Sequence, residues 1–286
     1  MQIGLVERYD YIAEEHYITT EDGYNLVIHR MPGTPLYVGQ KQRPVVFLKG
    51  GIFSSSDIWV LFGFGRDLPF LLADEGYDVW LGNSRGNTYC RSHVKLSPQN
   101  KNFWRYSYHE IGTKDLPVVI DYKIKLGICL VPIAIWKETI PSLEYFHKMI
   151  LNFKVKRYQN YIKIYFTYKF YEKNAVCTVT LLLRLPAMFL IAGSDPAQLN
   201  TLIKTLFLQT IIPILLSYYP AGSSVQLLDY IQDHYIQNMI IKKFQAYDYG
   251  YFDNYKQYGQ IMPIIYDLNK VTVPLAIYYS TNDLID

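Results

Sequence analysis

The 286-residue sequence predicts an α/β fold, because helix-like, strand-like and glycine-rich segments alternate along its first half. Residues 67–75 have the apolar spacing of an amphipathic helix. Residues 77–81 form a short apolar run typical of a buried strand, and residues 44–48 form another. Both runs end at glycines, Gly82 in the first case and the pair Gly50-Gly51 in the second. In α/β sheets the chemistry collects at the carboxyl ends of the strands, so both ends are candidate sites.

Two further strands are predicted near the amino terminus, at residues 17–19 and 24–29. The Asp22-Gly23 dipeptide between them is a strong signal for a tight hairpin. Near the other end of the sequence, the apolar residues 274–279 predict one more strand.

Length and composition leave the domain count open between one large α/β domain with an insertion and two smaller domains. Half of the residues are hydrophobic, which is enough for a sizeable core. The net charge of +3 is spread along the chain and gives no reason to expect nucleic acid as a partner. Cys90, Cys129 and Cys177 lack the spacing of metal ligands. Either all three are free thiols, or two form a disulfide and the third is free.

The amino-terminal residues have neither the basic start nor the apolar core of a signal peptide. The longest nearly continuous apolar run, residues 126–136, is too short to cross a bilayer. We therefore expect no signal peptide and no transmembrane segment in this sequence.

Ser84 lies in Gly82-Asn83-Ser84-Arg85-Gly86, which matches the Gly-x-Ser-x-Gly pattern of a nucleophile elbow. Such an elbow needs a helix directly after the serine, and residues 87–92 have no helical period. We interpret Ser84 as part of a structural turn and keep the nucleophile as the alternative. The paired glycines after residues 44–48 are typical either of an oxyanion hole or of an ordinary tight turn.

Several blocks resemble the animal acid and neutral lipases, a family with gastric, lysosomal and insect members and the α/β-hydrolase fold. The likeness spans residues 7–125 and 181–286. Its signatures are residues 17–24 (Tyr-Ile-Thr-Thr-Glu-Asp-Gly-Tyr), 71–89 (Leu-Leu-Ala-Asp-Glu-Gly-Tyr through Gly-Asn-Ser-Arg-Gly-Asn-Thr-Tyr), 110–122, 220–226 (Pro-Ala-Gly-Ser-Ser-Val-Gln), 243–250 and 273–286.

The resemblance implies a mostly parallel central sheet, here incomplete, with a partial helical cap. Four parts are expected along the chain: residues 1–125 as the amino-terminal part of the core, 126–180 as a segment foreign to the family, 181–259 as part of the cap, and 260–286 as a core strand with the catalytic acid.

The resemblance also assigns candidate site residues. Ile52 matches the residue whose backbone N–H binds the oxyanion, and Gly50 stands where relatives have histidine. Asp283 matches the acid of the Ser-Asp-His triad, although a strand-end cap is the alternative from local sequence alone. In relatives the turn that holds Ser84 is separate from the true elbow. No metal and no cofactor are expected.

Two parts of the machinery are missing from the matching positions. The elbow Gly-His-Ser-x-Gly is expected shortly after residue 122, where residues 126–180 resemble nothing in the family. In residues 151–173, 17 of 23 positions are Phe, Ile, Lys, Asn or Tyr, whose codons are rich in A and T. Translated non-coding sequence is one explanation, and a genuine lid or membrane-facing insertion is the other. Without the elbow strand, neighbouring strands would keep unpaired edges.

The triad histidine of relatives follows the acid, whereas all six histidines of this sequence (16, 29, 93, 109, 147 and 234) precede Asp283. The resemblance implies hydrolysis of carboxylic esters in neutral lipids, either triacylglycerol or steryl esters, at a lipid–water interface, in a secreted or lysosomal protein. The alternatives are an inactive lipid-binding relative, a mis-assembled gene product, and an esterase that uses Ser84.

Overall fold

The computed structural model describes most of the first 120 residues and parts of the remainder. The described residues are 3–34, 43–51, 53–120, 126–130, 214, 217–218, 221–224, 227 and 243–278. They belong to two compact units, which are considered separately. The first unit contains the described residues up to 106, those from 110 to 120 and those from 214 to 224; the second contains residues 107–109, 126–130, 227 and 243–278.

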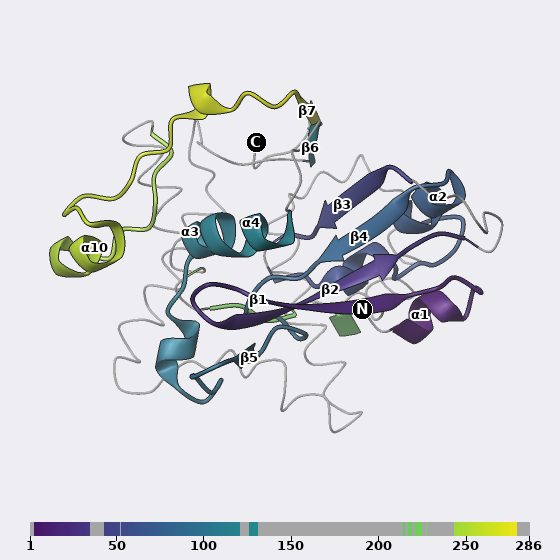
Figure 1. Ribbon diagram of the computed structural model, residues 1–286, viewed down its shortest axis with the longest axis horizontal. Helices are drawn as coiled ribbons and strands as arrows, with labels where there is room; N and C mark the ends of the chain where they lie inside the picture. The colour runs from purple at the N-terminus through teal and green to yellow at the C-terminus, as the bar shows by residue number, and fades with distance from the viewer. Residues whose placement is uncertain are drawn as a thin grey trace, which may run out of the picture. The chain divides into compact units, whose positions relative to one another are not determined.

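The first unit is built on a mixed sheet, in which four strands lie side by side in the order β1-β2-β4-β3 (Figure 1). Its strands are β1 (Glu14–Thr19), β2 (Tyr24–Met31), β3 (Val45–Lys49), β4 (Asp78–Gly82) and the short β5 (Ser92–His93). Strand β2 pairs antiparallel with β1, β4 and β5, and β3 pairs parallel with β4.

The predicted hairpin is confirmed as β1 and β2. Its turn needs Gly23, because φ at this residue is +96°, a conformation that side-chain-bearing residues rarely adopt. The predicted strands at residues 44–48 and 77–81 are present as β3 and β4, each shifted by one residue.

Short helical segments connect the strands. They are α1 (Ile3–Glu7), η1 (Ser56–Trp59), α2 (Leu68–Asp74), η2 (Lys101–Trp104), α3 (Tyr108–Glu110), the π-turn η3 (Ile111–Asp115) and α4 (Leu116–Val119). The predicted helix at residues 67–75 is confirmed as α2, which begins with Pro69 in its first turn.

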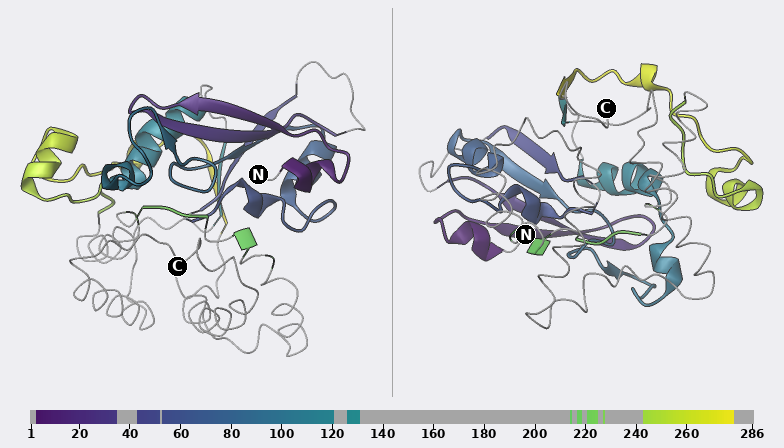
Figure 2. Two further views of the ribbon diagram at one scale, coloured as in Figure 1. Left: turned by 90° about the horizontal axis from the view of Figure 1, so that it is seen from below. Right: turned by 180° about the vertical axis from the view of Figure 1, so that it is seen from behind.

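One hydrophobic core joins α1 and α2 to β2 and β4, and Figure 2 shows both helices gathered beside one end of the sheet. Its buried residues are Leu5, Val6, Tyr11, Met31, Val60, Phe70, Ala73, Val79 and Leu81. Phe70 meets Tyr11 edge to face, with 5.1 Å between the ring centroids, which is a favourable aromatic geometry.

A second core supports the chain that follows β4. It contains the buried residues Tyr24, Leu26, Val27, Cys90, Phe103 and Tyr106, against which half-buried Val118 and Val119 of α4 pack. The turn after β4 is therefore fixed between β2 and α4.

Strand β3 departs from the expectation of a buried strand. Val45 is 61% exposed and the other four residues are half-buried. Among the described residues β3 pairs only with β4, so in this part of the chain it is an edge strand.

In the second unit, β6 (Gly127–Leu130) and β7 (Leu275–Tyr278) form a two-stranded parallel sheet. The unit also holds α10 (Tyr251–Tyr258) and η5 (Leu268–Lys270). The predicted strand at residues 274–279 is confirmed as β7, whereas β6, at the start of the segment 126–180, was not predicted. The rest of that segment and most of the predicted cap, 181–259, lie outside the described residues.

Candidate functional site

The candidate site lies where β3 and β4 end together. In their parallel register Lys49 is opposite Gly82, so the two strands deliver their following loops to the same edge of the sheet. The loop after β3 begins with Gly50-Gly51, and the loop after β4 holds Asn83, Ser84 and Arg85.

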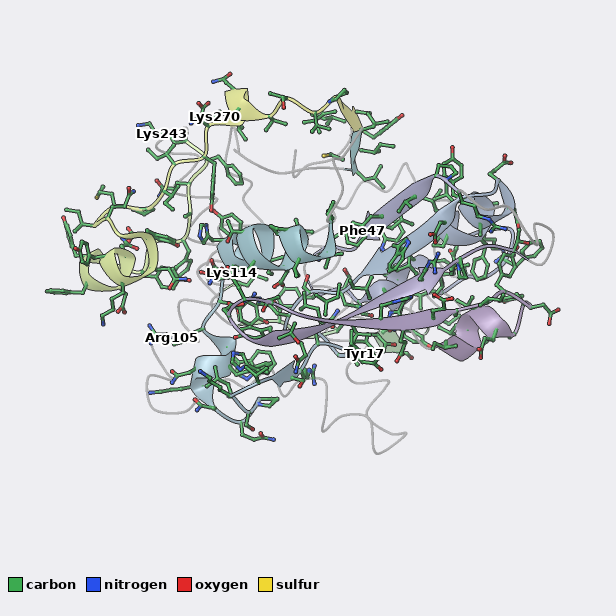
Figure 3. All side chains as sticks on the ribbon, viewed as in Figure 1. Tyr17, Phe47, Arg105, Lys114, Lys243 and Lys270 are labelled. Atoms are coloured by element: carbon green, nitrogen blue, oxygen red, sulfur yellow. The ribbon has the colours of Figure 1, made fainter. Side chains whose placement is uncertain are left out.

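Gly82 gives the side chain of Lys49 a path toward Ser84. A Cβ atom at Gly82 would overlap the ring of Phe47, which is labelled on β3 in Figure 3, and would lie 3.2 Å from Cδ of Lys49. With no side chain at Gly82, the Lys49 stem passes over the strand end. Its Nζ donates a hydrogen bond to Oγ of Ser84 and a longer one, 3.4 Å, to the carbonyl oxygen of Gly50.

The surroundings of Lys49 make its ammonium group easier to deprotonate. Burial removes water from the ammonium group and lowers the pKa of Lys49, while the charge of Asp115 and the nearby Cys90 act in the opposite direction. Lys49 and Ser84 are both half-buried, so each keeps a surface in contact with solvent. This is a hydroxyl beside an amine that loses its proton more readily than an exposed lysine.

The backbone after Ser84 forms a tight turn. The N–H of Gly86 donates to the carbonyl of Cys90 at 2.8 Å, and the N–H of Asn87 donates to the carbonyl of Ser84 at 3.2 Å. Residues 83–91, all of them described, contain no helix, which confirms the expectation from the sequence. Ser84 therefore lacks the following helix of a nucleophile elbow, and its chemical role stays a prediction.

Asn83 anchors the loop to two neighbouring elements. Its Oδ1 accepts from the backbone N–H of Ser56 at 2.9 Å and from Nδ2 of Asn87 at 2.8 Å. Its Nδ2 donates to the carbonyl of Val27 at 3.0 Å. A buried amide with these partners fixes the position of Ser84 one residue later.

Arg85, the residue after Ser84, is also anchored. Its fully buried guanidinium pairs with Asp115 at 2.6 Å and with Asp22 at 2.7 Å, and lies 4.1 Å from the ring centre of Tyr24. The hydroxyl of Tyr106 donates to the Arg85 carbonyl at 2.8 Å. These bonds connect the turn to the hairpin and to η3, so Ser84 stands between two buried anchors.

A second serine, Ser56, has triad-like neighbours but is enclosed. Its Oγ lies 2.8 Å from Nδ1 of His29, whose Nε2 lies 3.3 Å from Oε1 of Glu15. Ser56 and His29 are both 0% exposed, and the ring presents Nδ1 rather than Nε2 to the serine, the reverse of a serine triad. Burial lowers the pKa of His29 to about 4. An ester carbonyl has no access to this serine, so the arrangement is a structural network.

A residue larger than Gly50 in the loop after β3 would require the side chain of Ser54 to move. A Cβ at Gly50 would overlap Oγ of Ser54, which donates to the carbonyl of Gly51 at 2.6 Å. This contact favours glycine at a position where the resemblance leads one to expect histidine. Ile52, the expected oxyanion donor, and Asp283, the expected triad acid, lie outside the described residues.

Residues 221–224, part of a signature far along the chain, join these loops. The N–H of Ala221 donates to the carbonyl of Phe53 at 2.5 Å, and the Ala221 carbonyl accepts from Thr88 at 2.9 Å and from Arg91 at 3.2 Å. Phe53 has φ of 62°, which is unusual for a residue with a side chain. Two sequence blocks separated by more than 120 residues thus meet beside the candidate site.

Within the described ranges, no group of three or more His, Cys, Asp or Glu side chains could hold a metal ion. None of the helices in the described ranges is long and apolar enough to cross a membrane.

Lys49 is the site residue that sequence reasoning missed. Residues 45–48 are apolar, and a charged residue at the end of such a strand is a signal, since lysine is seldom buried without a reason.

The family model for the partial alpha/beta-hydrolase lipase region matches residues 4–63. Lipase 1 of Drosophila melanogaster is 32% identical over 98% of this chain and 67% of its own length. Human gastric triacylglycerol lipase is 32% identical, and human lipase member K 31%, each over 98% of this chain and 77% of the relative. An α/β hydrolase structure from Novosphingobium aromaticivorans DSM 12444 aligns with 41% of this chain and 34% of its own, at 19% identity and a TM-score of 0.26, too weak a superposition to support an argument.

Identity of this extent across nearly the whole chain confirms the resemblance and the α/β class. The chain belongs to the animal acid lipase family of α/β-hydrolases.

Proposed function

We propose that the protein hydrolyses carboxylic esters of neutral lipids, either triacylglycerol or steryl esters, by acyl transfer through a serine. The observation that carries this proposal is the similarity to lipases over 98% of the chain. The paired strand ends of β3 and β4 support it, because they place a hydroxyl, an amine and a glycine-rich loop at one edge of the sheet. The same kinship supports a secreted or lysosomal location.

The resemblance assigns site residues in two segments. Ile52 donates its backbone N–H to the oxyanion that forms when the ester carbonyl is attacked. Asp283 matches the acid that orients and stabilises the catalytic imidazole of relatives. Proline at position 52 would remove the N–H donor, so Ile52→Pro is expected to lower kcat about 10²–10³-fold, whereas Ile52→Val, which keeps the donor, should leave it unchanged.

The usual nucleophile is the part that this sequence lacks. No Gly-His-Ser-x-Gly occurs between residue 122 and Asp283. The alignments with Lipase 1 and gastric lipase run over 320 and 325 positions, more than the 286 residues of the chain, so these relatives carry residues with no counterpart here. A serine nucleophile in this chain must therefore lie outside such an elbow.

The direct test is fatty acid release by the purified full chain from emulsified triolein and cholesteryl oleate, beside the soluble ester p-nitrophenyl butyrate. Acid release that is linear in time and faster than in a heat-inactivated control is expected. Release from the emulsified esters should be faster than from the soluble ester. If the soluble ester alone is cleaved, the lipid assignment fails, and if neither is cleaved, the proposal fails.

The missing elbow also favours a second candidate, a lipid-binding relative without turnover. It predicts that the chain co-sediments with triolein emulsions while releasing no fatty acid. A third possibility is that the sequence is a mis-assembled gene product, which peptide mass spectrometry of the natural protein tests. Peptides from residues 126–180 should then be missing, and a peptide with Gly-His-Ser-x-Gly should be found in their place.

A further inference from the structure

We infer that Ser84 and Lys49 form a nucleophile–base pair that performs the ester hydrolysis at the joint end of β3 and β4. This inference rests on the proposed function, since it names the residues that would carry the same reaction. Pairs of serine and lysine are a known alternative to the serine triad, and they need neither the acid nor the histidine.

The geometry of the pair is set by the sheet. The parallel register fixes Lys49 opposite Gly82, the glycine clears the path of the lysine stem, and Ser84 follows two residues later. Nζ of Lys49 is within hydrogen-bond distance of Oγ of Ser84. In the ammonium form Nζ donates this bond, and after proton loss its lone pair accepts a bond from the serine hydroxyl.

Burial makes Lys49 easier to deprotonate, and two buried neighbours of Ser84 keep the serine in place. Burial is the main influence on Lys49, whereas the groups that favour its charge are Asp115 of η3 and Cys90 of the following turn. The carboxylate of Asp115 is already engaged by Arg85 at 2.6 Å. Asn83 and Arg85, both buried, fix the residues on either side of Ser84.

Exposure distinguishes this pair from Ser56 and its neighbour His29. Ser84 and Lys49 are half-buried, whereas Ser56 and His29 are fully enclosed. An ester carbonyl can approach only a serine that keeps a solvent-facing side. Of these two serines, the structure therefore assigns the nucleophile to Ser84.

The reaction is balanced in two steps. In the first, Oγ of Ser84 forms a bond to the ester carbonyl carbon while neutral Lys49 takes the hydroxyl proton; the bond to the alkoxy oxygen then breaks, and Lys49 returns the proton to the departing alcohol. In the second, water attacks the acyl-serine with its proton passing to Lys49, and the acid leaves as Ser84 recovers its proton.

The test compares variants of the full chain in hydrolysis of p-nitrophenyl butyrate and emulsified triolein. Ser84→Ala is expected to lower kcat to the buffer rate, and Lys49→Gln to lower it about 10²–10⁴-fold, the usual contribution of a general base. Lys49→Arg should be as inactive as Lys49→Gln, because arginine does not give up its proton. The matched controls Ser97→Ala and Lys95→Gln change exposed residues of one surface loop and should keep wild-type kcat.

Two further readouts separate chemistry from loss of structure. In the wild type kcat/KM should rise with pH as Lys49 loses its proton, and in Lys49→Gln this rise should disappear. A fluorophosphonate should label the wild type at Ser84, located by peptide mass spectrometry, whether or not the Ser84→Ala protein folds.

Turnover that survives in Ser84→Ala, or a label on another serine, overturns the pair and leaves the proposed function standing. A wild type that is folded but inert towards both esters overturns the proposed function itself.

Discussion

The guanidinium of Arg85 donates two hydrogen bonds to Oδ1 of Asp115, from Nε at 2.8 Å and from Nη2 at 2.6 Å. The Arg85 side chain is 0% exposed and that of Asp115 is 2% exposed. A charge so deeply enclosed is tolerated only when it is paired and hydrogen-bonded. The pair fixes the turn after β4, and with it the position of Ser84.

Replacing Arg85 should therefore be costly. Arg85→Met leaves the Asp115 carboxylate buried without its partner, and the free energy of unfolding is expected to fall by about 3–5 kcal/mol. Lys114→Met is the matched control. Lys114, labelled in Figure 3, lies 3.6 Å from Glu21 and 3.7 Å from Asp22 in a partly exposed group, so its loss should cost about 0–1 kcal/mol. Urea unfolding measures both, and equal losses in the two variants would contradict this account of Arg85.

Stability should fall in acid through Asp22. Burial opposes ionisation of this carboxyl, but hydrogen bonds from Arg85 and Thr20 outweigh it and lower the pKa of Asp22 below its ordinary 3.8. A lowered pKa contributes stability above pH 3.8, and this contribution is lost as the pH falls through the pKa of the folded state. The Tm difference between wild type and Asp22→Asn should thus be large at pH 6 and shrink below pH 4. A Tm difference that is the same at pH 6 and pH 3 would contradict this role of Asp22.

Gly222 should tolerate no side chain. Its φ is +99°, and a Cβ there would lie 2.5 Å from Nη2 of Arg91 and 3.2 Å from the Gly86 carbonyl. Gly222→Ala is expected to lower the free energy of unfolding by more than about 1 kcal/mol. Gly112→Ala is the control, since a Cβ at Gly112 meets nothing within 4 Å and φ is not positive. That variant should be neutral or more stable by about 0.4–1 kcal/mol. The pair of variants is compared by thermal and urea unfolding.

The network of Ser56 should matter for stability and not for turnover. Oγ of Ser56 lies 2.8 Å from Nδ1 of His29 and accepts from Nδ2 of Asn83 at 3.1 Å. Ser56→Ala leaves these buried groups short of a partner and should cost about 1–3 kcal/mol. Below its unfolding temperature the variant should keep the wild-type kcat for p-nitrophenyl butyrate. Loss of turnover in a fully folded variant would move the active serine to position 56.

Sequence patterns predicted the secondary-structure elements that are determined by residues close together in the chain. The Asp22-Gly23 turn, the helix α2 and the strands β3, β4 and β7 follow from residue order and hydrophobic period. The degree of burial of β3 does not, because it depends on which strands lie beside it. Strand β6 was missed for a similar reason, since its four residues become a strand by pairing with β7, almost 150 residues away.

The site was predicted only in part for the same physical reason. Ser84 was singled out by its motif, but its contact with Lys49 is set by the register of two strands and by the missing side chain of Gly82. The burial of Arg85 was not foreseen, since charged residues are mostly exposed and its two carboxylate partners come from distant segments. The roles of Ile52 and Asp283 stay predictions from the resemblance.

The most direct test of lipase-type acyl transfer by this chain is the detection of the acyl-enzyme. The full chain is mixed with p-nitrophenyl butyrate, quenched in acid within milliseconds to seconds, and its intact mass is measured. One butyryl group per chain is expected. Peptide mapping should locate it on Ser84, and it should disappear on longer incubation in water. A chain that binds triolein emulsions yet never carries a butyryl group and releases no acid would contradict it.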